Sequence, residues 1–207
     1  MFNTTEKKER SLGVKLFLKP VRCLSPKCVT VRRPTRPGAH AKGRRGTVSE
    51  YGEQLREKQK FQFSYGLKEN QLKRIFRRAL RNPEATGKLF LSILERRLDN
   101  VVFRLGFAPS RSVARQLISH GHIMVGSHRV TSPSYLARPG DVIFIREQSR
   151  SNQIFRDLAS NLKKYNPPSW LKINPETWEG KVESLPKDFE ESFDVNKVVD
   201  YYSKIVK

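Results

Sequence analysis

The sequence predicts an α+β fold, with a helical N-terminal region followed by two helices that pack on a small antiparallel sheet. Apolar residues recur at helical spacing in residues 72–80 and 89–105, and alternating segments separated by turn residues follow in residues 122–146. A hydrophobic content of 37% over 207 residues allows a modest core in one large domain or two small ones.

The first 46 residues are expected to form a basic, mostly irregular arm, apart from a short strand at Val14–Leu18. Residues 31–46, "VRRPTRPGAHAKGRRG", contain two prolines and three glycines, which exclude a regular helix. Such a stretch is either a solvated basic tail or an arm that becomes ordered along phosphates, and its cations favour the arm. These cations are Arg32, Arg33, Arg36, Lys42, Arg44 and Arg45.

Two helices are expected next. Thr47 and Glu50 have capping-box spacing, so the first helix begins between Thr47 and Ser49 and ends near Gly66. Like charges four residues apart on the second helix destabilise it by about 0.2–0.5 kcal/mol per pair, which favours a contact with RNA or DNA over a merely solvated face. That face lies opposite an apolar stripe and carries Lys73, Arg74, Arg77, Arg78 and Arg81.

Two further helices, one long and one short, are expected in residues 86–119. Thr86 can cap the long helix, whose apolar period continues to Gly106. Ser110 can cap the short helix, in which apolar residues 113, 114, 117 and 118 share one face. Arginines off the apolar stripe of the long helix are Arg96, Arg97 and Arg104. The outer face of the short helix has no acid and carries Arg111, Ser112, Arg115, Gln116 and Ser119.

A small antiparallel sheet follows the short helix. His122–Val125 alternates as a strand does, Gly126-Ser127 suits a two-residue type II′ turn, and the chain returns through His128–Val130. A turn at residues 139–141 leads into a strand at Val142–Arg146. After residue 150 we expect a helix over residues 154–162, short strands in "SWLKIN" and "WEGKVESLP", and a last helix over residues 195–206.

The positive charge is concentrated in the first 150 residues. The net charge is +10 in residues 1–50, +6 in residues 51–100, +5 in residues 101–150 and zero in residues 151–207. Because such an imbalance destabilises a compact state, it indicates a polyanionic partner such as nucleic acid. A membrane is disfavoured, since no apolar helix face with aromatic anchors accompanies the basic stretches. The N-terminus lacks the apolar core of a signal peptide, and two cysteines suit a reducing, cytoplasmic setting.

Two pairs of segments resemble a known family. Residues 94–125, "LERRLDNVVFRLGFAPSRSVARQLISHGHIMV", strongly resemble the S-four RNA-binding domain, and residues 133–150, "PSYLARPGDVIFIREQSR", continue the match. Residues 32–60, "RRPTRPGAHAKGRRGTVSEYGEQLREKQK", and the tail "VNKVVDYYSK" resemble the bacterial-type small-subunit ribosomal protein S four family. The module alone also occurs in RNA-modifying and tRNA-charging enzymes, whereas module, arm and tail together are highly specific.

The resemblance implies a structural constituent of the small ribosomal subunit that binds rRNA directly. It implies an arm at residues 1–46, a helical rRNA-binding domain at 47–94, the S-four module at 95–155, and a tail at 156–207 that completes the N-terminal domain. The implied role is to nucleate subunit assembly, near the mRNA entrance, with a contribution to translational accuracy. The implied partners are small-subunit rRNA, the neighbouring proteins S five and S three, and mRNA, in a ribosome of the cytoplasm or of an organelle.

Charge and resemblance together predict the rRNA-binding residues. Because side chains do not reach into the deep major groove of A-form RNA, these residues would recognise phosphates, 2′-hydroxyls and shape. Arg111 and Arg115 are expected to point outward, so that changing both to glutamate would weaken RNA binding and leave the fold intact. Besides the six cations of the arm, the predicted residues are Arg56, Lys58, Lys60, Lys73, Arg74, Arg77, Arg78, Arg97, Arg104, Arg111, Arg115, Gln116, His120, His122 and Arg129.

A metal site is not expected. Many members of the family carry four N-terminal cysteines that bind zinc, but only the second pair has counterparts here, Cys23 and Cys28. They are half of a tetrahedral site, which Glu6, Glu9 or His40 would have to complete. We therefore expect two reduced thiols and no cofactor.

Two other classes of function are compatible with an S-four module. An RNA-modifying enzyme such as a pseudouridine synthase needs a catalytic aspartate in a pocket, but residues 1–90 contain no aspartate. The sequence also lacks a P-loop and a dinucleotide fingerprint. A free-standing RNA-binding regulator or heat-shock factor is the second alternative, which cofractionation with small ribosomal subunits would distinguish. We expect no enzymatic activity.

Overall fold

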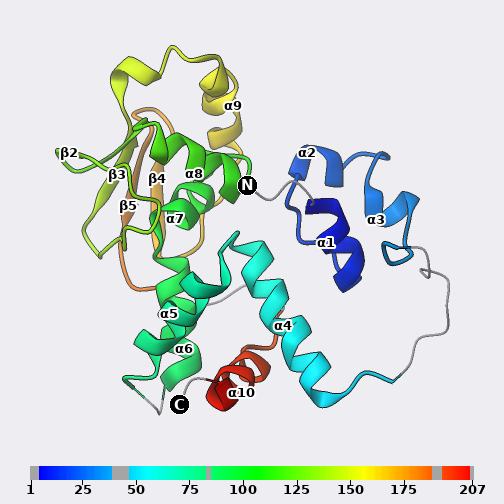
Figure 1. Ribbon diagram of the computed structural model, residues 1–207. Helices are drawn as coiled ribbons and strands as arrows, with labels where there is room; N and C mark the ends of the chain where they lie inside the picture. The colour runs from blue at the N-terminus through cyan, green and yellow to red at the C-terminus, as the bar shows by residue number, and fades with distance from the viewer. Residues whose placement is uncertain (1–4, 39–46, 83–84, 188–192, 206–207) are drawn as a thin grey trace. The chain divides into compact units, whose positions relative to one another are not determined.

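The chain folds into two compact units. A computed structural model describes residues 5–38, 47–82, 85–187 and 193–205. Unit 1 consists of residues 1–87 and 191–207, and unit 2 of residues 88–190. The predicted α+β fold is confirmed, since the described part of unit 1 is helical and unit 2 holds an antiparallel sheet (Figure 1). Among the described residues, no helix has the length and apolar character needed to cross a membrane.

The first part of unit 1 contains short helices, so the expectation of an irregular arm is wrong for the residues that the structure describes up to 38. Val14–Leu18 does not form the expected strand. Instead, Glu9 Oε1 accepts the N–H groups of Leu16 and Leu18 at 3.1 and 3.3 Å, which holds this segment against the preceding helix. The helices are α1 (Thr5–Leu12), α2 (Pro20–Cys23) and α3 (Val29–Arg32).

Three longer helices form the rest of unit 1. The N-cap of α4 is Ser49, whose hydroxyl accepts the Gly52 N–H at 3.2 Å. Helix α10 packs on α4, and its buried Tyr202 stacks on Phe76 of α5 at a ring-centre distance of 4.9 Å. The Tyr202 hydroxyl also donates to Glu69 Oε1 at 3.0 Å. The bounds are α4 (Glu50–Ser64), α5 (Glu69–Ala79) and α10 (Val195–Ile205).

The single long helix expected up to residue 105 is in fact two helices, α6 (Thr86–Glu95) and α7 (Leu98–Arg104). Arg97 has an extended backbone and pairs with Leu136 in an isolated β-bridge. Asn100 Nδ2 donates to the Glu95 carbonyl at 2.9 Å, which satisfies one of the unpaired carbonyls at the end of α6. The apolar period runs through this break, so the sequence pattern did not reveal it.

Five strands form one antiparallel sheet in unit 2, in the order β2-β1-β3-β5-β4. The predicted hairpin is confirmed, with Val125 opposite His128 and a positive φ of 55° at Gly126 but not at Ser127, as a type II′ turn requires. The strands are β1 (Ile123–Val125), β2 (His128–Arg129), β3 (Val142–Ile145), β4 (Leu171–Asn174) and β5 (Glu179–Val182).

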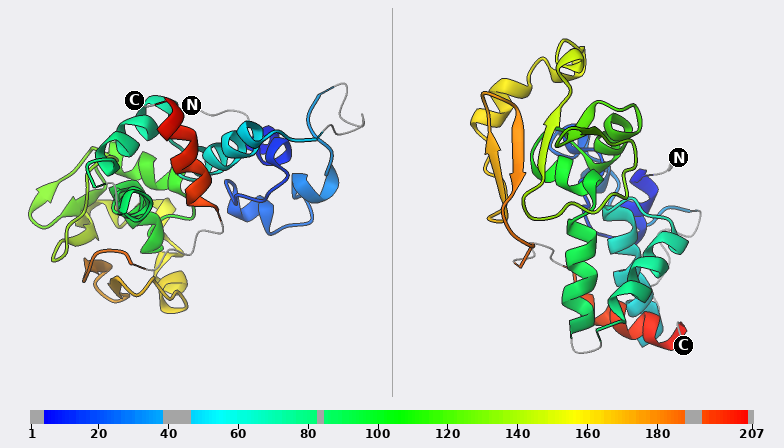
Figure 2. Two further views of the ribbon diagram at one scale, coloured as in Figure 1. Left: turned by 90° about the horizontal axis from the view of Figure 1, so that it is seen from below. Right: turned by 90° about the vertical axis from the view of Figure 1, so that its left-hand side faces the viewer.

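The tail divides between the two units, which corrects the expected boundary at residue 156. Strand β5 pairs with β3, with Gly180 opposite Ile143, and β4 extends the sheet beyond β5 (Figure 2). A 3-10 turn at Gln153–Phe155 and helix α9 (Leu158–Lys163) replace the single helix expected there. A second 3-10 turn, Glu147–Ser149, follows β3. Of the tail, only the segment containing α10 belongs to unit 1.

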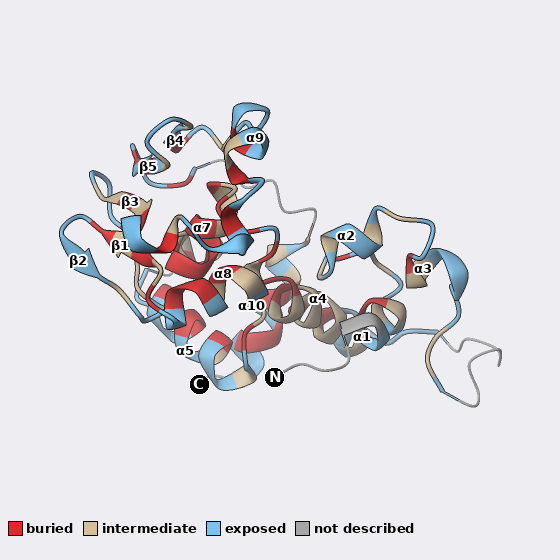
Figure 3. Ribbon diagram, turned by 90° about the horizontal axis from the view of Figure 1, so that it is seen from above, coloured by how far each residue is buried: buried red, intermediate tan, exposed pale blue. Residues whose placement is uncertain are grey.

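The core of unit 2 lies between the sheet and helices α7 and α8 (Arg111–Ser119). Leu105, the C-cap residue of α7, lies so close to β5 that a Cβ atom on Gly180 would overlap its side chain. Figure 3 shows mostly buried residues on α7, whereas both residues of β2 are exposed. Phe155 and Leu162 join the same core, so the residues after 150 complete the module.

Candidate nucleic-acid interface

The outer face of α5 in unit 1 and the turn after this helix carry five cations. Its apolar stripe, Leu72, Ile75, Phe76 and Ala79, is buried as the sequence pattern predicted. The cations on the other side make no ion pair or side-chain hydrogen bond with any described residue. Four of them are exposed and Lys73 is half-buried; these residues, here called the α5 basic face, are Lys73, Arg74, Arg77, Arg78 and Arg81.

The predicted cations of α4 are less available to a ligand. Lys58 is only 6% exposed, because its ammonium lies 2.8 Å from Glu69 Oε2 and 5.1 Å from the ring centre of Tyr201. The prediction that Lys58 lies on the RNA-binding surface is therefore wrong. Lys60 is half-buried and pairs with Glu57, and Arg56 is half-buried.

The described part of the arm, residues 5–38, contains helices α1, α2 and α3 and is here called the N-terminal lobe. It carries the first of the predicted cations of the arm. Arg32 and Arg33 are exposed at the end of α3, and Arg36 is half-buried. Arg10 of α1 donates to the carbonyls of Thr35 and Arg36 at 3.0 and 3.3 Å, which ties this segment to the lobe. The remaining residues of interest in this segment, His40, Lys42, Arg44 and Arg45, lie outside the described residues.

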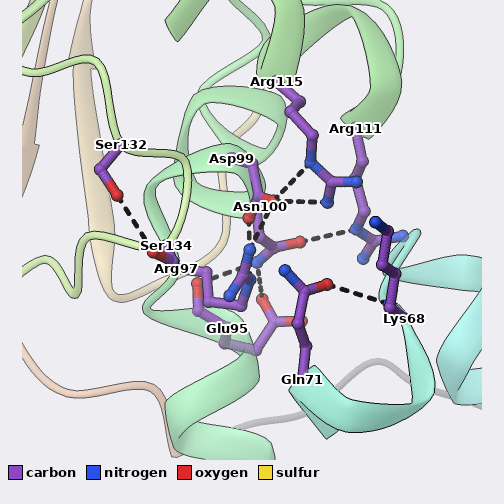
Figure 4. Close-up of polar contacts among 10 residues, drawn as sticks. All are labelled: Lys68, Gln71, Glu95, Arg97, Asp99, Asn100, Arg111, Arg115, Ser132 and Ser134. Carbon is purple, nitrogen blue, oxygen red and sulfur yellow. Dashed lines mark hydrogen bonds and ion pairs between the residues drawn. The ribbon is translucent and has the colours of Figure 1, made fainter. Parts of the chain in front are cut away.

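A buried carboxylate organises two of the predicted arginines in unit 2 (Figure 4). Asp99 of α7 is 2% exposed, and its Oδ2 lies 2.9 Å from Arg97 Nη2 and 2.6 Å from Arg115 Nη2. Arg97 is itself only 5% exposed. Arg97 was predicted to lie on the RNA-binding surface, and the structure corrects this, because its guanidinium forms a buried ion pair with Asp99.

A second set of contacts holds the neighbouring arginines. Glu95 is buried and accepts from Arg104 Nε at 3.2 Å and from Asn100 Nδ2 at 2.9 Å. Asn100 Oδ1 in turn accepts from Arg111 Nε at 2.7 Å, and the Arg111 guanidinium carbon lies 4.9 Å from the ring centre of Phe103. The side chains of Arg104 and Arg111 are therefore fixed in direction by α6 and α7.

These contacts correct the expectation of an acid-free outer face on α8. The acid comes from α7, where Asp99 lies sixteen residues before Arg115 in the sequence. The side chain of Arg115 is 31% exposed, so the ion pair with Asp99 holds it at the surface and does not bury it. A glutamate at position 115 would place a carboxylate beside the buried carboxylate of Asp99, so the double glutamate variant would not leave the fold intact. Gln116 is exposed, as expected.

A third basic group surrounds the turn between α8 and β1. The Arg129 guanidinium lies over Gly121, where a Cβ atom would overlap it, and it donates to the His120 carbonyl at 3.1 Å. His122 Nδ1 lies 2.9 Å from Ser149 Oγ. Burial, and then the nearby charges of His120, Arg129 and Arg146, lower the pKa of His122. His122 is therefore largely neutral at neutral pH, and a phosphate placed there would favour its protonation.

The two cysteines, Cys23 and Cys28, are free thiols. Burial raises the pKa of Cys23, whereas a hydrogen bond with Thr30, at 3.0 Å from the Cys28 sulfur, lowers the pKa of Cys28. Glu9, at a position expected for a zinc ligand, uses Oε1 to accept two backbone N–H groups. Within the described ranges, no group of three or more histidines, cysteines and acids is arranged to hold a metal ion.

Sequence reasoning missed the residues that orient the arginines, namely Glu95, Asp99 and Asn100. The first two are acids in a chain of strongly positive charge, and no motif marks them as partners of cations on another helix. The only signal was the spacing of Asp99 on the polar side of a helix, which equally fits a solvated acid.

Comparison with known proteins agrees with this arrangement. The family descriptions "Ribosomal protein S4/S9 N-terminal domain" and "S4 domain" match residues 2–95 and 96–143. Small ribosomal subunit protein uS4 of Halothermothrix orenii is 47% identical over 94% of both chains, and that of Thermus thermophilus is 45% identical over 94% of both. The uS4 protein of Pelotomaculum thermopropionicum is 48% identical over 86% of this chain and 85% of its own. The chain therefore belongs to the uS4 family of small ribosomal subunit proteins.

Proposed function

We propose that this chain is a structural component of the small ribosomal subunit and binds its rRNA directly. The observation that carries the proposal is the α5 basic face, whose five cations make no ion pair with any described residue. Membership of the uS4 family, a non-enzymatic family, supports it. No cofactor is part of the proposal, and metal analysis of the purified chain tests that point.

The binding surface is proposed to act through rigid presentation of charge. Arginine forks grip two phosphate oxygens at once, and a folded RNA is recognised through its backbone and shape. The ion pair of Asp99 with Arg115 fixes a side chain that would otherwise lose conformational entropy on binding. The residues proposed to contact rRNA are those expected from the sequence, except Lys58 and Arg97.

A role early in assembly follows from direct rRNA binding, and we propose that this chain nucleates the subunit before other proteins join. The tail from residue 151 has equal numbers of acids and cations and two tryptophans, which suits contacts with protein neighbours such as S five and S three. A position near the mRNA entrance, with an effect on translational accuracy, is the finer part of the proposal.

The test is the salt dependence of binding to small-subunit rRNA, compared with an unrelated structured RNA of equal length. Each phosphate contact contributes about 0.7–0.9 to the slope of log affinity against log salt, so a surface of six or more contacts gives a slope steeper than about −4. The unrelated RNA should bind more weakly at every salt concentration. A slope near zero, or equal binding of the two RNAs, contradicts the proposal.

A further inference from the structure

The two cysteines of the sequence lie together in the N-terminal lobe. Cys23 is the last residue of α2, and Cys28 is the N-cap residue of α3. The segment between them folds back on itself, and the Cys28 N–H donates to the Ser25 carbonyl at 3.0 Å. This turn brings the two thiols into contact, since Cys28 is a hydrogen-bond partner of the Cys23 thiol. Two thiols in contact are the arrangement that disulfide formation requires.

The surroundings of the two thiols differ. Cys23 is half-buried, so a small reagent can reach it, whereas Cys28 is 4% exposed. The Thr30 hydroxyl, 3.0 Å from the Cys28 sulfur, lowers the pKa of Cys28 by hydrogen bonding. Burial raises the pKa of Cys23. Because the thiolate is the reactive form, Cys28 is prepared to attack a sulfur atom held at Cys23.

A metal ion is a poorer explanation of this pair. A structural zinc site takes four ligands, and Glu9, whose charge acts on Cys23, already uses Oε1 to accept two backbone N–H groups. Within the described part of the chain, no third histidine, cysteine or acid completes a group that could hold a metal ion. Two thiols alone are enough for a disulfide. In a reducing compartment such a bond is transient and responds to the redox state.

We propose that Cys23 and Cys28 form a reversible oxidation site, which closes to an intramolecular disulfide by exchange with a small disulfide such as oxidised glutathione. The Cys23 thiolate attacks one sulfur of the small disulfide, breaks its S–S bond and releases one thiolate. The Cys28 thiolate then attacks the Cys23 sulfur of the mixed disulfide and releases the second thiolate. The chain loses two electrons and two protons, and the small disulfide takes up both as two thiols. The inference goes beyond the proposed function, because no step of it involves RNA.

Closure of the disulfide changes the N-terminal lobe as well as its thiols. The new bond joins the end of α2 to the start of α3. Arg22 precedes Cys23 and Val29 follows Cys28, and both line a cavity of about 350 Å³ among the short helices. The bond therefore fixes the separation of two walls of this cavity. Amide exchange in α2 and α3 should slow in the oxidised form, while exchange in unit 2 stays unchanged.

The test is to equilibrate the full chain with glutathione buffers of increasing oxidised fraction and to count free thiols by alkylation and mass spectrometry. The wild type should lose both thiols in one transition and retain no glutathione. The same chain unfolded in urea is the control. The folded chain should close at a ratio of squared reduced to oxidised glutathione at least about tenfold higher than the unfolded chain, because the fold already holds the thiols together.

Single substitutions separate the two steps of the exchange. Cys28→Ser leaves the reachable thiol without its partner and should retain one glutathione per chain. Cys23→Ser leaves only the buried thiol, which should take up glutathione at least about tenfold more slowly, because reactivity follows exposure. Thr30→Val keeps the shape of the side chain and removes the hydroxyl beside Cys28, so the mixed disulfide should persist longer before closure. Thr35→Val, at an exposed position of the same lobe, is the matched control.

The proposal is overturned if the wild type retains two glutathiones, if it forms disulfide-linked dimers, or if the folded and unfolded chains close at the same ratio. The comparison in urea uses only the wild type, so it decides the question should a variant fail to fold by circular dichroism. Closure of Thr30→Val at the wild-type rate would overturn the assignment of Cys28 as the thiol that attacks the mixed disulfide.

Discussion

At the scale of single residues, Asp99 shows how a buried acid can serve a basic surface. Taking a carboxylate and two guanidinium groups out of water is costly, and the cost is offset only when every group is paired. Here Arg97 is buried on one side of Asp99, and Arg115 reaches it from α8 with part of its side chain still in solvent. The acid therefore links α7 to α8 and sets the direction of an arginine at the surface.

Replacing Asp99 with asparagine should destabilise unit 2 by about 3 kcal/mol, because removal of one partner leaves a buried cation uncompensated. The shape of the side chain is nearly unchanged, so the loss reports charge and not packing. Urea unfolding measures it, with Asp200→Asn, at an exposed position on α10, as the control. A loss below about 0.5 kcal/mol, the usual range of a surface substitution, would show that the pair carries no stability.

The sequence predicted which face of α8 each residue occupies but not the partners of that face. Helical period alone placed Leu117 inward and Arg115 outward; the burial of Leu117 confirms the first placement, whereas Arg115 is half-buried. The pairing of Arg115 with Asp99 depends on how α7 crosses α8, which no local pattern contains. Lys58 was expected at the surface from its charge and from the resemblance, and its pairing with Glu69 of α5 is likewise a contact between helices that no local pattern contains.

At the scale of elements, α5 combines a well-packed apolar stripe with a face of one charge. Its stripe is buried against neighbouring helices of unit 1, and this burial offsets the repulsion between cations one turn apart. Stability and binding therefore place opposite demands on the exposed face.

Neutralising Arg74→Gln/Arg78→Gln should leave unfolding free energy unchanged or raise it by about 0.2–0.5 kcal/mol, since one like-charge pair is removed. The same variant should weaken rRNA binding at least about tenfold, because hydrogen bonds to charged groups contribute about 1.5–3 kcal/mol each. Thermal unfolding and an RNA titration at fixed salt measure both. Wild-type affinity in this variant would mean that the α5 basic face does not contact RNA.

Elements defined by local turn chemistry were predicted well, and those defined by distant contacts were not. Gly126-Ser127 specifies its own hairpin, and Pro139-Gly140 starts the strand that became β3. The break between α6 and α7 has no such signal, because Arg97 leaves the helix to pair with Leu136, thirty-nine residues later. The helices of the N-terminal lobe were missed because each is short and is held by tertiary contacts such as those of Glu9.

At the scale of the whole molecule, the tail contributes to both units. Residues 156–187 supply β4, β5 and part of the core of unit 2, and α10 then closes unit 1 against α4. The sequence suggested these elements one by one. It did not indicate which unit each element joins, because the pairing of β5 with β3 joins residues almost forty positions apart. Net charge gives no signal either, since both parts of the tail are neutral.

This division predicts different outcomes for two truncations. A chain ending at residue 190 loses Tyr202 and the rest of α10, and removal of a buried aromatic side chain costs about 3–5 kcal/mol. Amide protection should then fall in α4 and α5 while Ile143 and Ile145 in β3 stay protected. A chain ending at residue 150 also strips β5 from β3 and exposes the core that Phe155 and Leu162 cover, so protection in β3 should be lost as well.

Hydrogen exchange on both truncations, beside full-length Tyr202→Phe, distinguishes these outcomes. The phenylalanine variant removes only the hydroxyl that donates to the Glu69 carboxylate and should keep protection in both units, with a loss of about 1.5 kcal/mol for one hydrogen bond to a charged group. Retained protection of β3 in the chain ending at residue 150 would mean that the S4 module folds without its last two strands. Loss of β3 protection in the chain ending at residue 190 would instead mean that the two units depend on each other for stability, which the separation of their cores does not predict.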